Sequence, residues 1–243
     1  MKALILAAGM ASRLRPLTAN TPKCLLKIGE RCLLQRSIDA LIASGIDEFV
    51  IVTGFLREKI ESFVACHYPN LKVTFIFNEV FDSTNNIYSL WLARKEVEGC
   101  DTLLLDSDLL YDPEIIKRIL AEKSPNILTL IKHPLGEEEI KVIVDDKGSI
   151  VELNKTCNPA DAIGESLGIE RMGVDYTTAL YKELDGMMNH EHLENVFYEV
   201  AFERLAKQGH CFSVLDVTDL FSCELDTVED FENARQMVPA HLF

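Results

Sequence analysis

Five continuous apolar runs, each the length of one strand, constrain the fold of this chain most strongly. They are residues 2–7, 48–54, 71–77, 102–106 and 126–132, and stretches with helical spacing separate them. Strands that are apolar on both faces lie inside a covered sheet, and strands that alternate with helices form parallel βαβ units. The pattern predicts an α/β fold with a doubly wound, mostly parallel sheet. Helices are expected near 34–44, at 56–67 and at 112–121, the last capped by Asp112.

The pattern changes after residue 131. Residues 140–144 and 149–155 flank the turn Asp-Asp-Lys-Gly and predict a hairpin, and residues 165–172 predict another strand. Helices are expected at 174–184 and 195–208, strands at 211–217 and 221–226, and a last helix from Thr227. A chain of 243 residues is long enough for one large domain, here with a C-terminal β-rich extension over the sheet edge.

Composition excludes several classes of protein. A net charge of -15 opposes a nucleic-acid partner, which needs a basic surface, and no apolar run is long enough to span a membrane. The seven cysteines form no C-x-x-C pair, which is typical of reduced core thiols in the cytoplasm. Seven of the basic residues lie within residues 1–36, against the single acid Glu30. This gathering predicts a local site for a compact polyanion, although a solvated basic face is also consistent with it.

The loop after the first strand contains small residues followed by basic ones. Ala8, Gly9 and Ala11 allow backbone N–H groups to approach phosphate oxygens, and Arg13 and Lys23 add positive charge. The loop has neither the G-x-G-x-x-G of dinucleotide-binding folds, which opposes an oxidoreductase, nor the P-loop pattern. A connection that is merely rich in small residues stays open on these residues alone.

The run L-A-A-G-x-x-S-R-L-x-P-L-T, followed by P-K, resembles the signature of the nucleotidyltransferases that make sugar nucleotides and CDP-alcohols. The resemblance implies a Rossmann-like fold and assigns catalytic roles to Arg13 and Lys23. It also implies that the loop wraps the nucleotide's triphosphate, through Leu6, Ala8, Gly9, Met10, Ala11 and Ser12. The chain departs from the family at Ala11, where glycine is usual.

Acidic residues end two of the expected strands. Asp106 and Asp108 follow the run at 102–106, at the strand end where open α/β sheets bind ligands. Carboxylates so placed suit Mg²⁺, and Asp226 in Glu-Leu-Asp-Thr is a second candidate. Asp226 or Thr227 is equally consistent with a helix cap. The resemblance assigns the metal to Asp108 and Asp226, with Asp106 as a nucleotide-side neighbour.

An Asn-rich segment supplies groups that suit the edge of a base, because amides both donate and accept hydrogen bonds. Asn78, Thr84 and Asn85 lie in it, and Asn85 is also suited to cap the next helix. The run F-N-x-x-x-x-x-x-N-N-x-Y-S-L resembles the phosphocholine cytidylyltransferase branch, which implies CTP as the nucleotide.

The resemblance places the second substrate, the acceptor, near residues of the C-terminal part. They are Lys141 and Lys155 for a phosphate or phosphonate, and Glu165, Tyr198 and Glu199 for an amine. Solvated charge is the alternative for both lysines, and core packing for Tyr198. Residues 134–145 contain no aromatic residue, although phosphocholine enzymes are expected to have some there. GESLGIER, by contrast, resembles the aminoethylphosphonate branch.

We therefore expect a Mg²⁺-dependent cytidylyltransferase that transfers CMP from CTP to a small phosphate- or phosphonate-bearing alcohol or amine. Residues 1–131 would form its nucleotide-binding core, and residues 132–243 the acceptor part with the returning metal-ligand segment. Two alternatives stay open: a sugar-1-phosphate nucleotidyltransferase using UTP or dTTP, and a non-catalytic nucleotide-binding regulatory module. The sequence does not decide whether the chain forms a homo-oligomer.

Overall fold

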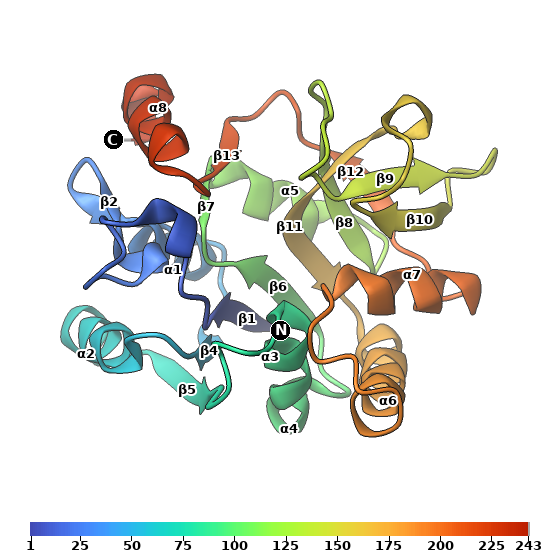
Figure 1. Ribbon diagram of the computed structural model, residues 1–243, viewed down its shortest axis with the longest axis horizontal. Helices are drawn as coiled ribbons and strands as arrows, with labels where there is room; N and C mark the ends of the chain where they lie inside the picture. The colour runs from blue at the N-terminus through green and yellow to red at the C-terminus, as the bar shows by residue number, and fades with distance from the viewer. Residues whose placement is uncertain (243) are drawn as a thin grey trace.

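The computed structural model describes residues 1–242, and within them one nine-stranded sheet forms the centre of the molecule (Figure 1). Its main path is β10-β9-β11-β6-β1-β4-β5, with β8 beside β11 and β12 beside β8. The strands are β1 (Lys2–Ala7), β4 (Glu48–Thr53), β5 (Lys72–Phe77), β6 (Thr102–Asp106), β8 (Ile127–Ile131), β9 (Lys141–Val144), β10 (Ile150–Asn154), β11 (Gly164–Met172) and β12 (Ser213–Asp216). Two short antiparallel pairs lie apart: β2 (Lys27–Ile28) with β3 (Arg31–Cys32), and β7 (Leu109–Tyr111) with β13 (Ser222–Glu224).

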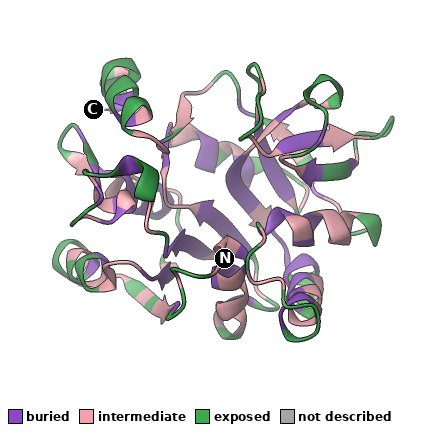
Figure 2. Cartoon of the chain, viewed as in Figure 1, coloured by how far each residue is buried: buried purple, intermediate pink, exposed green. Residues whose placement is uncertain are grey.

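Helices cover both faces of the sheet, which is buried between them (Figure 2). One face packs against α1 (Leu33–Ala43), α2 (Arg57–His67) and α5 (Glu114–Ala121); the other packs against α3 (Asn86–Leu92), α4 (Arg94–Val97), α6 (Val174–Asn189) and α7 (Glu199–Lys207). In β1, Ala3 and Ile5 face the first group and Leu4 and Leu6 the second. This two-sided burial explains why the strands read as continuous apolar runs.

A third apolar cluster fastens the end of the chain to its beginning. Helix α8 (Val228–Met237) packs through Phe231 and Ala234 against Leu14 and Leu33. The remaining helical turns are η1 (Ser12–Leu14), η2 (Lys23–Leu25), η3 (Pro159–Asp161) and η4 (Ala240–Leu242). The last strand and helix are thereby held beside the loop that follows β1.

The parallel core brings the candidate residues to one edge of the sheet. Strand β1 pairs in parallel with β4 and β6, and Leu6 lies opposite Asp106 in the register. Strand β5 extends the core in parallel beyond β4. The predicted doubly wound α/β sheet is confirmed, and the loop after β1 and the acids after β6 leave the sheet side by side.

Strand β11 interrupts the parallel order of the sheet. It runs antiparallel between β6 and β8. Strand β8 therefore has the same direction as the core strands but does not pair with them. Strands β9, β10 and β12 also continue the central sheet, whereas the sequence predicted an extension laid over its edge. Strand β5 is the far edge, and its residues Lys72 and Thr74 are exposed, so it is not buried on both faces as predicted.

Two helix boundaries also differ from the prediction. Helix α6 runs on to Asn189, and α7 begins at Glu199, four residues later than expected. The segment before α7 is held by α3 instead: Asn85 N–H donates to the Glu194 carbonyl, and Tyr198 N–H donates to the Asn86 side chain. These bonds hold the turn-rich segment that leads into the helix.

Cys24, Cys32 and Cys157 are buried, as the predicted core thiols should be. All seven cysteines are free thiols, although Cys66 is exposed and is not part of the core. Within residues 1–242 no helix is long and apolar enough to cross a membrane.

Candidate active site

The loop after β1 turns sharply at Ala11. This residue has φ 45° and ψ 53°, in the left-handed region that favours glycine. Two hydrogen bonds to its carbonyl hold the turn, from Leu14 N–H at 3.1 Å and from the Thr18 hydroxyl at 2.8 Å. The turn explains why related loops carry glycine here, and the tertiary structure holds alanine in the same conformation.

A large open cleft, about 990 Å³ in volume, lies over this loop. From the loop it is lined by Leu6, Ala8, Gly9, Ala11 and Arg13, whereas Met10 and Ser12 do not line it. Of the seven basic residues in the first 36, only Arg13 and Lys23 line the cleft. Arg31 and Arg36 instead donate to the Leu242 carbonyl. The predicted gathering of basic charge therefore reduces to two residues at the site.

Three carboxylates meet opposite the loop. Asp108, Glu224 and Asp226 each offer an oxygen atom, and these atoms lie within 4.8 Å of one another. Strand β13 brings the last two into place by pairing with β7, and Leu225 N–H donates to the Asp108 carbonyl at 3.2 Å. The chain's far end thus returns beside Asp108, by pairing with β7 and not with the central sheet as predicted.

Thr227, not Asp226, caps the last helix. Its hydroxyl accepts from Asp230 N–H at 3.2 Å, and the Asp230 carboxylate accepts from Thr227 N–H at 2.7 Å. This capping box leaves the Asp226 carboxylate free to face the cleft. The sequence left these two roles undecided, and the structure separates them.

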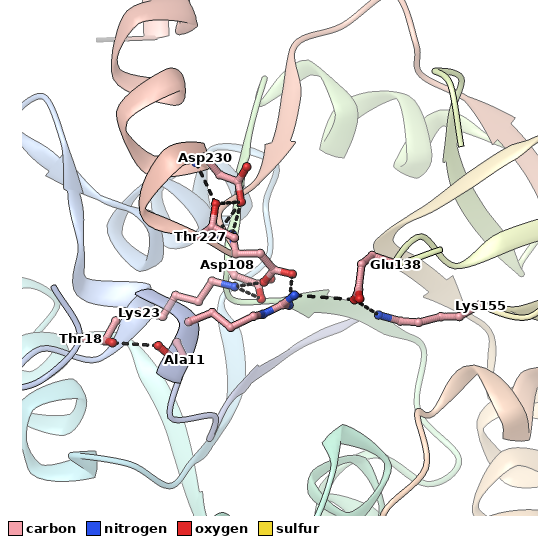
Figure 3. A network of polar contacts seen from close by, with 10 residues as sticks. Ala11, Thr18, Lys23, Asp108, Glu138, Lys155, Thr227 and Asp230 are labelled. Carbon is pink, nitrogen blue, oxygen red and sulfur yellow. Dashed lines mark hydrogen bonds and ion pairs between the residues drawn. The ribbon is translucent and has the colours of Figure 1, made fainter. Parts of the chain in front are cut away.

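Two cations lie against the carboxylates (Figure 3). Lys23 Nζ is 2.8 Å from Asp108 Oδ2 and 2.7 Å from Asp226 Oδ1, and the Arg13 guanidinium bonds Asp226 Oδ2. Arg13 also lies 3.6 Å from Glu138, which in turn lies 3.4 Å from Lys155. Acidic and basic side chains therefore alternate from Asp226 through Arg13 and Glu138 to Lys155.

The pKa values reflect this crowding of charge. Glu224 is exposed to the cleft. Its pKa is nevertheless raised to about 8, first because the surrounding protein keeps water from the carboxyl and then because Asp108 and Asp226 lie nearby. Burial alone would lower the pKa of Lys23, but the two aspartates outweigh it and raise the pKa. Burial likewise opposes ionisation of Asp226, and Lys23 reverses the effect and lowers its pKa.

The carboxylate cluster fits a divalent cation of the Mg²⁺ type. All of its donors are oxygen atoms, which hard cations prefer. Asp108 Oδ1 is buried without a hydrogen-bond partner, and buried polar atoms are normally paired. An oxygen atom left in this state beside two further carboxylates is suited to a metal ligand.

The Asn-rich segment is more internally bonded than the sequence predicts. Asn78 is 1% exposed; its amide donates to Thr84 and Ser89 at 3.1 and 3.2 Å, and its oxygen accepts from Val80 N–H. Asn85 Oδ1 caps α3 by accepting from Asn86 N–H at 2.7 Å. All of these groups except Val80 line the cleft. Asn78 therefore shapes the wall through its internal bonds.

The predicted acceptor residues divide into two groups. Lys155, Glu165 and Glu199 line the cleft, whereas Lys141 and Tyr198 do not. Lys141 is 1% exposed and donates to the carbonyls of Glu139 and Lys155 at 3.2 and 2.7 Å. It is therefore neither a solvated charge nor a cleft-lining contact, because its ammonium ties the β9 and β10 ends together.

Tyr198 belongs to the core beneath the cleft. Its ring is fully buried, and its hydroxyl donates to Asp106 Oδ2 at 2.9 Å. Burial, Asp108 and Glu199 raise the pKa of Asp106 well above its usual range. Tyr198 thus fixes the orientation of a cleft-lining carboxyl without reaching the cleft itself.

Lys155 and Glu165, both predicted acceptor residues, line the same cleft. Lys155 Nζ lies 4.7 Å from the centre of the Phe197 ring, and Glu165 bonds His133 Nε2 at 2.6 Å. Glu199 is 6% exposed, one of its oxygen atoms has no partner, and burial raises its pKa to about 7. Lys155, Glu165 and Glu199 therefore offer one cation and two acids to a ligand in the cleft.

Family comparison identifies the chain. A family model described as the MobA-like NTP transferase domain matches residues 3–147. The chain belongs to this family. The predicted nucleotidyltransferase family is thereby confirmed. The matched residues include the loop after β1 and Asp108, and both line the cleft.

The sequence similarity to curated relatives extends over nearly the whole chain. The CTP:phosphoglutamine cytidylyltransferase of Campylobacter jejuni is 24% identical over 96% of this chain and 98% of its own length. The choline-phosphate cytidylyltransferase of Haemophilus influenzae is 26% identical over 97% of each chain. The CTP:phosphocholine cytidylyltransferase structure from Streptococcus pneumoniae has the same fold, with a TM-score of 0.80 at 20% identity over 98% of this chain and 99% of that one.

Gly168 is predicted to be essential for the position of Asp106 in this nucleotidyltransferase. It has φ +80°, and a Cβ atom there would lie 2.8 Å from Asp106 Oδ2. We expect Gly168→Ala to destabilise the protein by more than the roughly 1–2 kcal/mol that a left-handed alanine costs. Chemical denaturation measures the difference. Gly148→Ala is the matched control, because Gly148 has φ +79° and open space around it; equal losses in both variants would contradict the predicted overlap.

Glu170 is predicted to make stability depend on pH. It is fully buried, one oxygen atom lacks a partner, and burial together with the nearby Glu199 raises its pKa well above the usual range. A raised pKa in the folded state makes folding most favourable below the unfolded pKa, about 4.3, and this stability is lost as pH rises through the folded value.

Glu170→Gln is therefore expected to raise the free energy of unfolding at pH 8, with the gain shrinking towards pH 4. Thermal unfolding across this range tests it. Glu137→Gln, at an exposed position, controls for the loss of one charge. A gain that does not change with pH would show that ionisation of Glu170 is not the cause.

Proposed function

We propose that this protein transfers CMP from CTP to a small phosphate- or phosphonate-bearing alcohol or amine and releases pyrophosphate. The observation that carries the proposal is the meeting of Asp108, Glu224 and Asp226 with Arg13 and Lys23 across one cleft, beside the small-residue loop. Oxygen ligands for a metal and two cations are the groups that phosphoryl and nucleotidyl transfer requires.

The reaction needs little acid or base chemistry from the chain. The acceptor's phosphate or phosphonate oxygen is already anionic, so it attacks the α-phosphorus without a general base, and pyrophosphate leaves. Arg13 and Lys23 would neutralise charge on the attacked and leaving groups. Asp108, Glu224 and Asp226 would hold Mg²⁺, which when bound supplies further neutralisation of the phosphate oxygens.

The loop from Leu6 to Arg13 is proposed to wrap the triphosphate with its backbone N–H groups. Thr84 and Asn85 line the wall where the base would lie, and Asn78 holds Thr84 in place through its own hydrogen bond. A preference for CTP is supported by the relatives, which are cytidylyltransferases by name.

At the other end of the cleft, Lys155 is proposed to hold the acceptor's phosphate or phosphonate. Glu165 and Glu199 suit a cationic amine on the same molecule, since both line the cleft and Glu199 has an unpartnered oxygen atom. In the part of the chain that the structure describes, Phe81 and Phe197 are the aromatic residues of the lining. Glu138 and Glu139 also line the cleft, so carboxylates outnumber these two aromatic residues, which favours an amine that donates hydrogen bonds.

A matrix of nucleotides and acceptors tests the proposal. CTP, UTP, dTTP and ATP would each be combined, with Mg²⁺, with phosphocholine, phosphoethanolamine, 2-aminoethylphosphonate, a polyol phosphate and glucose 1-phosphate, and pyrophosphate release followed. We expect release with CTP and an amine-bearing acceptor. Release with UTP or dTTP and the sugar phosphate would replace this proposal by a sugar-nucleotide synthase, and CTP binding without release would indicate a regulatory module.

A further inference from the structure

We infer that Lys23 is the built-in counter-ion of the metal site: its ion pairs with Asp108 and Asp226 compete with a divalent cation for these carboxylates. A nucleotide's triphosphate then provides the anion to which Lys23 transfers, so metal and nucleotide bind together. The inference rests on the proposed function, because it concerns the regulation of the same site.

The contacts of Lys23 carry the first step. Its ammonium is 2.8 Å from Asp108 Oδ2 and 2.7 Å from Asp226 Oδ1, and its side chain is only 11% exposed. It therefore occupies one position on each of the two carboxylates that the site offers to a metal. An ammonium is a compact point charge, and it satisfies both oxygen atoms at once.

Charge repulsion explains what Lys23 contributes to the carboxylate cluster. Three carboxylate oxygens lie within 4.8 Å of one another, and among residues 1–242 Asp226 has one other cationic partner, Arg13. Without Lys23 the carboxylates would repel one another in a partly buried site, where such interactions are poorly screened. Lys23 thus stabilises the ligand set in its assembled geometry.

The same contacts make Lys23 a competitor of a divalent cation. A metal on Asp108 and Asp226 would face the ammonium at close range, and like charges so near disfavour each other strongly. Lys23 can move only if another anion replaces the carboxylates. The cleft that it lines also contains the loop proposed to wrap the triphosphate, so the nucleotide is the anion within reach.

The coupling is reciprocal, because two ligands that help each other must do so by the same factor. Nucleotide binding should tighten metal binding, and metal binding should tighten nucleotide binding. Removal of the Lys23 charge should break this link by freeing the carboxylates in advance.

Titration of Mn²⁺ into the nucleotide-free protein, followed calorimetrically, tests the inference. The variants are Lys23→Met, which removes the charge, and Lys23→Arg, which keeps it. Lys132→Met is the control, since it removes a cleft-lining lysine that pairs with Asp216 and with none of the three carboxylates. We expect Lys23→Met to bind Mn²⁺ at least about tenfold more tightly than the wild type, and the other two variants to bind it like the wild type.

Nucleotide-dependent Mn²⁺ binding provides a second measurement. Addition of a non-hydrolysable CTP analogue should tighten Mn²⁺ binding at least about tenfold in the wild type and clearly less in Lys23→Met. If Lys23→Met fails to fold in EDTA, restoration of its circular dichroism by Mn²⁺ supports the inference, and failure of Mn²⁺ to restore it overturns the inference.

Equal Mn²⁺ affinity in Lys23→Met and the wild type would overturn the inference, as would wild-type affinity that the nucleotide analogue does not change. These outcomes are separate from the proposed function. Absence of pyrophosphate release with every acceptor would remove the proposed reaction, whereas the binding titrations would still report whether Lys23 competes for the carboxylates.

Discussion

Replacement of Asp108 by Ala is expected to lower pyrophosphate release by roughly 10³-fold or more, because loss of metal-supplied charge stabilisation costs several kcal/mol. Asp108 contributes one of the three clustered carboxylates, and its Oδ1 has no hydrogen-bond partner among the described residues. The fold should persist, since Lys23 keeps its bond to Asp226 and one source of repulsion is gone. Steady-state kinetics with a saturating acceptor, together with thermal unfolding in EDTA, measure both effects.

Asp146→Ala is the matched control for this variant. Asp146 lies in the exposed turn of the β9–β10 hairpin, so its loss removes one carboxylate away from the cleft. Activity should then match the wild type. Full turnover in Asp108→Ala would remove Asp108 from the metal site, and loss of turnover together with unfolding would show a structural role instead.

Replacement of Arg13 by Ala is expected to lower kcat by roughly 10²-fold, the usual cost of removing one group that stabilises charge in the transition state. Stability should hardly change, because the Arg13 side chain is 54% exposed and exposed ion pairs contribute little. The expected signature is a fall in kcat that exceeds any rise in KM for CTP.

Arg235→Ala serves as the control, since Arg235 pairs only with Glu232 on the surface of α8. It removes the same charge from the molecule and should leave kcat unchanged. An Arg13→Ala variant whose KM rises while kcat is preserved would show that Arg13 contributes to ground-state binding alone.

The sequence predicted the parts of the site that depend on local pattern. Gly9 and Arg13 follow one predicted parallel strand, and the acids follow another at 102–106. The carboxyl ends of parallel strands share one edge of the sheet, so these residues were expected to lie together. Glu224 was missed as a member of the carboxylate cluster. The signal was present, because residues two apart on a strand face the same side, and Glu224 lies two residues before Asp226.

Other features depend on distant contacts that a single sequence does not reveal. Lys141 is buried because carbonyls of Glu139 and Lys155 receive its ammonium, and no periodicity predicts such a pair. Asn78 was expected to read a base, but its amide is used by Thr84 and Ser89. The antiparallel insertion of β11 also follows from long-range pairing, which local propensity leaves open.

The most direct test of the central claim is the identity of the product formed by the wild-type protein. Phosphorus NMR of a reaction containing CTP, Mg²⁺ and 2-aminoethylphosphonate or phosphocholine would follow every phosphorus atom at once. The proposed transfer predicts pyrophosphate together with a pair of coupled resonances from a new P–O–P link between CMP and the acceptor. Intact CTP, or free CMP with no coupled pair, in every acceptor reaction would contradict it.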